Sequence, residues 1–194
     1  MKKGLLIILS GPSGVGKGTI RKKIIKNPKL NLAYSISMTT RQRREKEIDG
    51  LDYYFVTKDY FKENLAKGNF LEHCEFVGNF YGTPKDKVEE LRNQGKNVFL
   101  EIEVSGAAEV MSKVEGEDIV SIFLAPPSLR VLEQRIRRRK TESEEIIQKR
   151  LEKARREMDA GKNYDYIVMN DVVRRAANEV TEIILRKIEE NKNK

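Results

Sequence analysis

A phosphate site is indicated near the amino terminus by nine consecutive residues, Gly11-Pro12-Ser13-Gly14-Val15-Gly16-Lys17-Gly18-Thr19. They follow an apolar run, Gly4–Leu9, that predicts a buried strand, and they open a segment over 17–26 that predicts a helix. Glycines at this spacing let backbone N–H groups turn inward around a phosphate, and Lys17 can reach the outer phosphates. Gly18 stands where the motif usually has Ser or Thr, so Thr19, water and the phosphates must share the binding of Mg²⁺. A purely structural Gly-rich turn is the alternative.

The net charge also favours an anionic partner. The 194 residues include 38 Lys and Arg against 30 Asp and Glu, which gives a formal net charge of +8. The segment from Arg130 to Arg156 alone has 11 basic and 5 acidic residues, so most of the excess lies there. Nucleic acid, a membrane surface and nucleotide phosphates all remain open as partners, and a solvated helix face is the alternative.

The composition excludes several classes of protein. Hydrophobic residues make up 39% and charged residues 35%, which excludes collagen-like, mucin-like and wholly disordered chains. The apolar run Leu5–Leu9 is far shorter than a transmembrane helix. Cys74 is the one cysteine and cannot form an intramolecular disulfide, which favours a reducing cytoplasm. His73 is the one histidine, so mechanisms that need two are excluded, and we expect both residues to pack or to face solvent.

Short apolar runs alternate with helical patterns along the chain. Strands or extended segments are predicted at Gly4–Leu9, Tyr34–Ser37, Asp52–Val56, Phe70–Phe80, Asn97–Glu103, Asp118–Leu124 and Tyr166–Asn170. Helix starts are predicted at Thr57, at Thr83-Pro84 with Thr83 as the cap, and at a capping box over 141–144. Strands that alternate with helices predict an α/β domain with a mainly parallel sheet, and ligands in such sheets bind at the carboxyl ends of the strands.

Six spaced motifs resemble those of guanylate kinases. They are Gly11–Thr19, Ser35–Arg44, Asp49–Phe55, Phe70–Glu72 with Gly78–Thr83, Phe99–Glu103 and Arg139–Glu142, and they run in order between about Leu5 and Asp171. The resemblance implies a P-loop kinase of one domain over 1–194, with a five-stranded core sheet flanked by helices. The core would cover about 1–33, 84–127 and 158–194, the GMP-binding subdomain about 34–83, and a helical lid about 128–157.

The resemblance also implies a binding site for GMP. Arg41 and Arg44 are cations three residues apart, suited to hold a dianionic phosphate by forked hydrogen bonds. Tyr53 and Tyr81 would add O–H donors to the same phosphate. By the same resemblance, Ser37 and Thr83 would place hydroxyls at the guanine edge. An ordinary solvated loop is the alternative for the basic stretch alone.

Glu72 is the residue expected to select the base. A carboxylate can accept hydrogen bonds from both N1–H and the exocyclic amine of guanine. Adenine has a lone pair at N1 and no amine at C2, so the carboxylate would be left unpaired at a cost of several kcal/mol. An exposed glutamate on a strand is the alternative.

The remaining site residues follow from the resemblance. Arg135 and Arg139 align with arginines of a lid that closes over ATP, Arg150 aligns with a third, and Asn170 matches a residue that contacts adenine. Glu101 stands where the family more often has Asp, and would meet a ribose hydroxyl or Mg²⁺-bound water. Ser105 stands where relatives commonly have Gln, and Lys140 where they usually have Gly.

Taken together, the residues predict the reaction ATP + GMP ⇌ ADP + GDP, with Mg²⁺ entering as MgATP and dGMP left open as a second acceptor. The acceptor is already an anion, so no general base is required. We expect a cytoplasmic enzyme with neither nucleic acid nor membrane as a partner, and the sequence leaves the oligomeric state open. Three alternatives stand: another P-loop nucleoside monophosphate kinase, a non-catalytic guanylate-kinase-like binding module, and a nucleic-acid binder.

Overall fold

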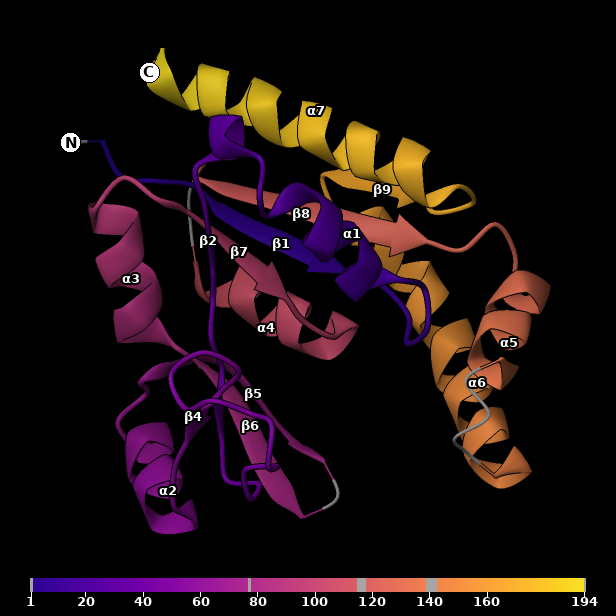
Figure 1. Cartoon of the computed structure of the whole chain (residues 1–194), viewed down its shortest axis with the longest axis horizontal. Coiled ribbons are helices and arrows are strands. Elements are labelled where there is room, and N and C mark those ends of the chain that lie inside the picture. The colour runs from indigo at the N-terminus through magenta and orange to yellow at the C-terminus, as the bar shows by residue number, and fades with distance from the viewer. Residues whose placement is uncertain (1, 77, 115–117, 139–142, 194) are drawn as a thin grey trace.

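The computed structural model describes residues 2–76, 78–114, 118–138 and 143–193, and its centre is a five-stranded sheet (Figure 1). The strands are, in sheet order, β2 (Leu32–Tyr34), β7 (Asn97–Glu101), β1 (Leu6–Ser10), β8 (Ile119–Ala125) and β9 (Tyr166–Met169). All four neighbouring pairs are parallel, so the carboxyl ends of the strands lie along one edge. The prediction of an α/β fold with a mainly parallel five-stranded core sheet is confirmed.

Helices cover both faces of this sheet. They are α1 (Lys17–Ile24), α3 (Lys85–Asn93), α4 (Val104–Lys113) and α7 (Val173–Lys192). Ile7 and Leu9 of β1 pack with α1 and α7 on one face, whereas Leu6 and Ile8 pack with α3 and α4 on the other. Because successive residues of a strand point to opposite faces, a strand covered on both sides has to be continuously apolar. This explains the run that opens the chain.

A second, four-stranded sheet lies apart from the first, at the lower left of Figure 1. Its strands are, in order, β4 (Tyr54–Phe55), β3 (Met38–Thr39), β6 (Asn79–Pro84) and β5 (Phe70–Phe76), and α2 (Lys58–Ala66) packs beside it. The ring of Phe61 from α2 stacks on the rings of Phe70 and Phe80, with centroid separations of 4.4 and 5.5 Å. These three rings join helix and sheet, and Thr57 caps α2 as predicted, accepting from the Tyr60 N–H at 3.2 Å.

Two further helices, α5 (Leu129–Arg137) and α6 (Glu144–Met158), form a pair at the lower right of Figure 1. Short 3₁₀ turns, η1 (Pro28–Leu30) and η2 (Asp159–Asn163), complete the described elements. The predicted capping box includes residues 141 and 142, which lie outside the described residues. No helix in the described part of the chain is long and apolar enough to span a membrane.

Three local predictions were wrong. Thr83 does not cap α3, because it lies in β6 and its hydroxyl is used elsewhere, so the helix begins after Pro84. The segment Ser35–Ser37 is not a strand but the connection between the two sheets. The extended stretch Phe70–Phe80 is a hairpin, which turns near Gly78 and continues to Pro84.

A buried arginine ties α3 to the start of the core sheet. The side chain of Arg92 is 2% exposed, and its Nε donates to the Gly4 carbonyl at 2.9 Å. Its two other nitrogens lie 3.0 Å from Glu89 and 3.6 Å from Asp118. A buried guanidinium with partners on every side stabilises the fold only while those partners stay in place.

We therefore expect Arg92→Met to lower the free energy of unfolding by about 2–4 kcal/mol, because it leaves the Gly4 carbonyl without its donor. Urea denaturation followed by circular dichroism measures the change. Lys87→Met, on the exposed side of the same helix, is the control and should change stability by less than about 0.5 kcal/mol. Equal stabilities for the two variants would contradict this role for Arg92.

Candidate active site

Two cavities adjoin at the carboxyl end of β7 and share one wall. The first, of about 430 Å³, is lined by the glycine-rich loop and the start of α1. The second, of about 240 Å³, is lined by residues of the smaller sheet and of α4. Glu101, Ile102 and Glu103 line both cavities. A ligand in one cavity would therefore meet a ligand in the other across the end of this strand.

The glycine-rich loop leaves the amino end of α1 open to a ligand. Gly16 caps the helix in a left-handed conformation (φ 106°) and offers no side chain. A Cβ at this position would also lie 2.6 Å from the side-chain nitrogen of Asn170, so only glycine fits. The amides of Thr19 and Ile20 donate to the Gly16 carbonyl. Lys17, Gly18 and Thr19 of the first turn line the first cavity, where the partial positive charge of the helix terminus favours an anion.

Lys17 folds back over this loop. Its Nζ donates to the Gly11 carbonyl at 2.6 Å, which places the ammonium in the curl of the loop. Burial lowers the pKa of Lys17, while the carboxylates of Glu101 and Glu103 act in the opposite direction. A partly buried cation whose hydrogen bond, within the described residues, goes to a carbonyl can still take an anionic partner, which is the role that a phosphate would fill.

The outer side of the loop is held by residues far away in the sequence. Asn170 follows β9, is 1% exposed, and donates from Nδ2 to the Val15 carbonyl at 2.8 Å. Arg135 of α5 donates to the same carbonyl at 3.2 Å and to the Asn170 carbonyl at 2.7 Å. Both residues thus position the loop in this structure, and neither lines the first cavity as far as the described residues go.

The structure says less about the other two arginines predicted for the lid, Arg139 and Arg150. Arg139 lies outside the described residues. Arg150 is on α6 and partly exposed. The same helix reaches the shared wall through Lys153, whose Nζ lies 2.6 Å from a carboxylate oxygen of Glu103.

Glu72 lies in the wall of the second cavity with Ser37, Tyr53 and Tyr81. It is 7% exposed, and its Oε1 accepts a hydrogen bond from the Thr83 hydroxyl at 2.6 Å across the β5–β6 hairpin. Burial raises the pKa of Glu72, and the bond from Thr83 partly offsets this. A buried carboxylate with one donor retains capacity to accept further hydrogen bonds from a ligand.

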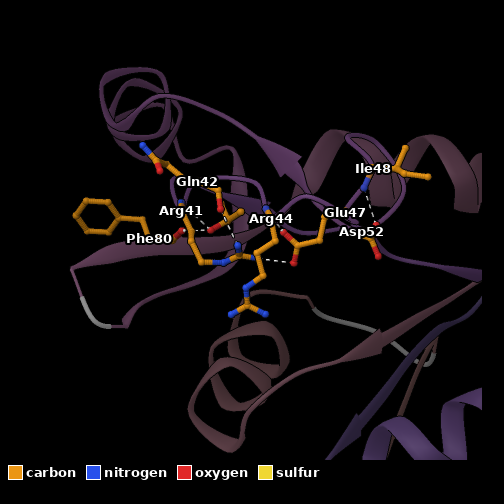
Figure 2. Close-up of polar contacts among 8 residues, drawn as sticks. Arg41, Gln42, Arg44, Glu47, Ile48, Asp52 and Phe80 are labelled. Carbon is orange, nitrogen blue, oxygen red and sulfur yellow. Dashed lines mark hydrogen bonds and ion pairs between the residues drawn. The ribbon is translucent and has the colours of Figure 1, made fainter.

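Arg41 lies beside this cavity and is already engaged by a carboxylate (Figure 2). Its Nη2 is 2.7 Å from Glu47 Oε1, and the other oxygen of Glu47 accepts from the Arg44 N–H at 2.8 Å. The guanidinium also lies 5.6 Å from the ring centroid of Tyr53. The hydrogen bond with Glu47 raises the pKa of Arg41, and a smaller contribution comes from Tyr81. Glu47 therefore holds the Arg41 guanidinium beside both tyrosines.

We expect Arg41→Ala to raise the KM for a phosphate-bearing acceptor by about tenfold to hundredfold, since a charge-assisted hydrogen bond is lost. The KM for the nucleotide in the first cavity should stay the same. Steady-state kinetics with each substrate varied in turn measure both values. Arg43→Ala, an exposed neighbour, is the control, and equal effects of the two variants would contradict the assignment.

Glu101, on the shared wall, carries an ion pair that the sequence did not reveal. Its Oε2 lies 3.1 Å from Nε of Arg21, one turn after Lys17 on α1. Burial raises the pKa of Glu101, and the nearby cations Arg21, Lys17 and Lys22 act against this. The Glu101 side chain thus lies between α1, which lines the first cavity, and the second cavity.

Sequence reasoning missed three residues that shape the site. Glu47 and Arg21 were overlooked because each pairs with a residue brought close only by folding. Gly106 was not singled out by its sequence, yet a Cβ there would lie 2.8 Å from a carboxylate oxygen of Glu72. A glycine in the first turn of a helix beside a candidate site is the signal that could have found it.

Comparison with known proteins points to one family. A family model described as guanylate kinase matches residues 3–187. The crystal structure of guanylate kinase from Anaplasma phagocytophilum shares 32% sequence identity with this chain and superposes with a TM-score of 0.72. That match covers 94% of this chain and 85% of the other.

Proposed function

Because the chain belongs to the guanylate kinase family, we propose that it is an active enzyme that transfers the γ-phosphoryl group of ATP to GMP. The observation that carries the proposal is the pair of adjoining cavities. One contains the loop and Lys17, the other contains Glu72, and the two share the wall of Glu101 to Glu103. The products would be ADP and GDP, and dGMP is left open as a second acceptor.

In this proposal the first cavity binds ATP. The loop amides and Lys17 hold the phosphates, where charge develops during transfer of the phosphoryl group. Arg139 and Arg150 would add positive charge when the segment 128–157 closes as a lid. Arg135 would join them after releasing the carbonyls of Val15 and Asn170, to which it donates here. Asn170 lies outside the lining of the first cavity here, and we propose that it contacts adenine through its Oδ1, a buried atom without a hydrogen-bond partner among the described residues.

Mg²⁺ suits the donors at this site. Thr19, Glu101 and Glu103 bring oxygen atoms to the first cavity. Within the described residues, no group of three or more His, Cys, Asp or Glu could hold a metal by itself. Mg²⁺ is commonly bound by one or two carboxylates together with substrate phosphates, so Thr19 and Glu101 would hold it through water on MgATP. The ion would neutralise charge on the phosphates.

In the second cavity GMP would be held at both ends. Arg41, Arg44, Tyr53 and Tyr81 would take its phosphate, while Ser37, Glu72 and Thr83 would take the guanine edge. The acceptor oxygen is an anion, so no base is needed, and the one histidine, His73, does not line either cavity. Catalysis would rest on alignment, on exclusion of water and on stabilisation of charge.

The basic segment favours this reading over nucleic-acid binding. Several of its cations are paired along the two helices: Arg137 with Glu133 and Glu144, Lys149 with Glu145, and Arg156 with Glu152. Such pairing lowers the charge available to a polyanion, whereas Arg135, predicted to act on ATP, donates here to two uncharged carbonyls and keeps its charge. We propose that the excess positive charge of this segment helps it to close over ATP. We also propose that the enzyme acts in the cytoplasm.

A coupled assay of ADP formation tests the proposal. ATP and Mg²⁺ are combined with GMP, AMP, CMP or UMP in turn, and we expect turnover with GMP at least about 10²-fold above the others. Preference for AMP would favour another nucleoside monophosphate kinase. Binding of GMP without turnover would favour a non-catalytic module, and either result would contradict the proposal.

A further inference from the structure

Glu101 reaches toward α1 into space that a missing side chain leaves open. Its Oε1 lies 3.3 Å, and its Oε2 3.8 Å, from the position that a Cβ of Gly18 would occupy. The phosphate-loop motif usually has Ser or Thr at position 18. The side chain of Ser or Thr at that position would crowd the Glu101 carboxylate. Gly18 thus leaves the room that the longer side chain of Glu101 occupies.

Arg21 holds the same carboxylate by its charge. The distance from its Nε to Glu101 Oε2 is 3.1 Å, and both side chains are largely withdrawn from solvent. The contact is an ion pair rather than a hydrogen bond, because this Nε has no hydrogen-bond partner among the described residues. Its guanidinium carbon lies 4.3 Å from the ring centroid of Tyr34 in β2, which is a cation–π contact. Arg21 therefore lies between a tyrosine of the core sheet and the carboxylate that it attracts by charge.

The contact between Arg21 and Glu101 matters because of where Glu101 lies. Glu101 lines both cavities, so a shift of its carboxylate would change the wall where the two ligands meet. A displacement of about 1 Å in a group that aligns substrates can cost about 10²-fold in rate. A longer carboxylate at this position needs a fixed partner, because its extra methylene adds a freely rotating bond.

We propose that Arg21 is a positioning residue for the phosphoryl transfer. It fixes the Glu101 carboxylate on the wall between the two nucleotides, in the space that Gly18 leaves. The inference rests on the proposed function, since it concerns how Glu101 is presented to the acceptor GMP. Arg21 also lines the first cavity, but the role proposed for it is exerted through Glu101.

A double-mutant cycle tests the charge contact. Arg21→Met and Glu101→Gln should each lower kcat/KM for GMP by about tenfold, and the double variant should lose little more than either alone. Any change in the KM for ATP should be similar in Arg21→Met and Glu101→Gln, whereas general damage to α1 would raise it in Arg21→Met alone. Arg21→Lys should recover part of the loss. Lys23→Met, exposed on the same helix and away from both cavities, is the matched control.

A second pair of variants tests the match in size without removing any charge. Gly18→Ser alone should lower kcat/KM for GMP, and adding Glu101→Asp, which shortens the carboxylate, should restore most of it. If the wild-type enzyme turns over GMP but the two substitutions of each cycle act independently of one another, this inference is overturned while the proposed function stands. A wild-type chain without GMP turnover would overturn the proposed function, and this inference with it.

Discussion

Lys17→Ala is expected to lower kcat by about 10³-fold or more, because it removes the cation that the loop curls around. The KM or dissociation constant for GMP should change by less than about threefold, since Lys17 lines the first cavity and not the second. Steady-state kinetics give kcat, and calorimetric titration of GMP gives the binding constant.

Lys23→Ala is the matched control for this variant. It removes the same charge from the same helix, but Lys23 is exposed and lies by a separate hollow between α1 and α7. Its kcat should match that of the wild type. Substantial turnover by Lys17→Ala, or an equal loss in Lys23→Ala, would contradict the role given to Lys17.

The second large effect is expected from Glu72→Gln, in the preference for GMP over AMP. A buried carboxylate can accept from N1–H and from the exocyclic amine of guanine, whereas an amide presents one acceptor and one donor. The donor would face the guanine N–H groups but could bond the lone pair at N1 of adenine. We expect kcat/KM for GMP to fall by about 10²-fold and the preference over AMP to fall at least as far.

Glu75→Gln on the same strand is the control, because Glu75 is exposed and lies outside the cavity lining. Thr83→Val adds a second measurement, since it removes the donor to Glu72 while leaving the carboxylate. It should weaken GMP binding by less than Glu72→Gln does. An unchanged ratio of GMP to AMP turnover in Glu72→Gln would place base selection on other residues.

Much of the architecture could be predicted because it depends on local patterns. The apolar run of β1 and the glycine-rich loop each show, within a few residues, what they pack against or bind. The parallel order of the strands then follows from their alternation with helices. Thr57 was also predicted correctly as a cap, since its partner lies three residues away.

The errors come from contacts that local sequence does not encode. Thr83 precedes a proline and has the local pattern of a helix cap, but its hydroxyl bonds to Glu72 on the neighbouring strand. A buried carboxylate gains more from that donor than a helix terminus open to water would. The turn near Gly78 was missed because both arms of the hairpin have the composition of strands.

The candidate residues of the site could be predicted from the sequence, whereas the residues that pair with them could not. The types and order of Lys17, Arg41 and Glu72 were predicted, and the structure brings them to two adjoining cavities or, for Arg41, beside one. The pairings of Arg41 with Glu47, Arg21 with Glu101 and Lys153 with Glu103 join segments that meet only in the fold. Charge patterns give no partner for such residues until the topology is known.

The central claim is that this chain moves a phosphoryl group from ATP to GMP, and labelled transfer tests it most directly. ATP radiolabelled on its γ-phosphate is incubated with GMP, Mg²⁺ and the wild-type chain, and the nucleotides are separated by chromatography. We predict that the label appears in GDP and that Lys17→Ala abolishes its appearance. Label that stays in ATP, or that is released only as inorganic phosphate while GMP is bound, would contradict the claim.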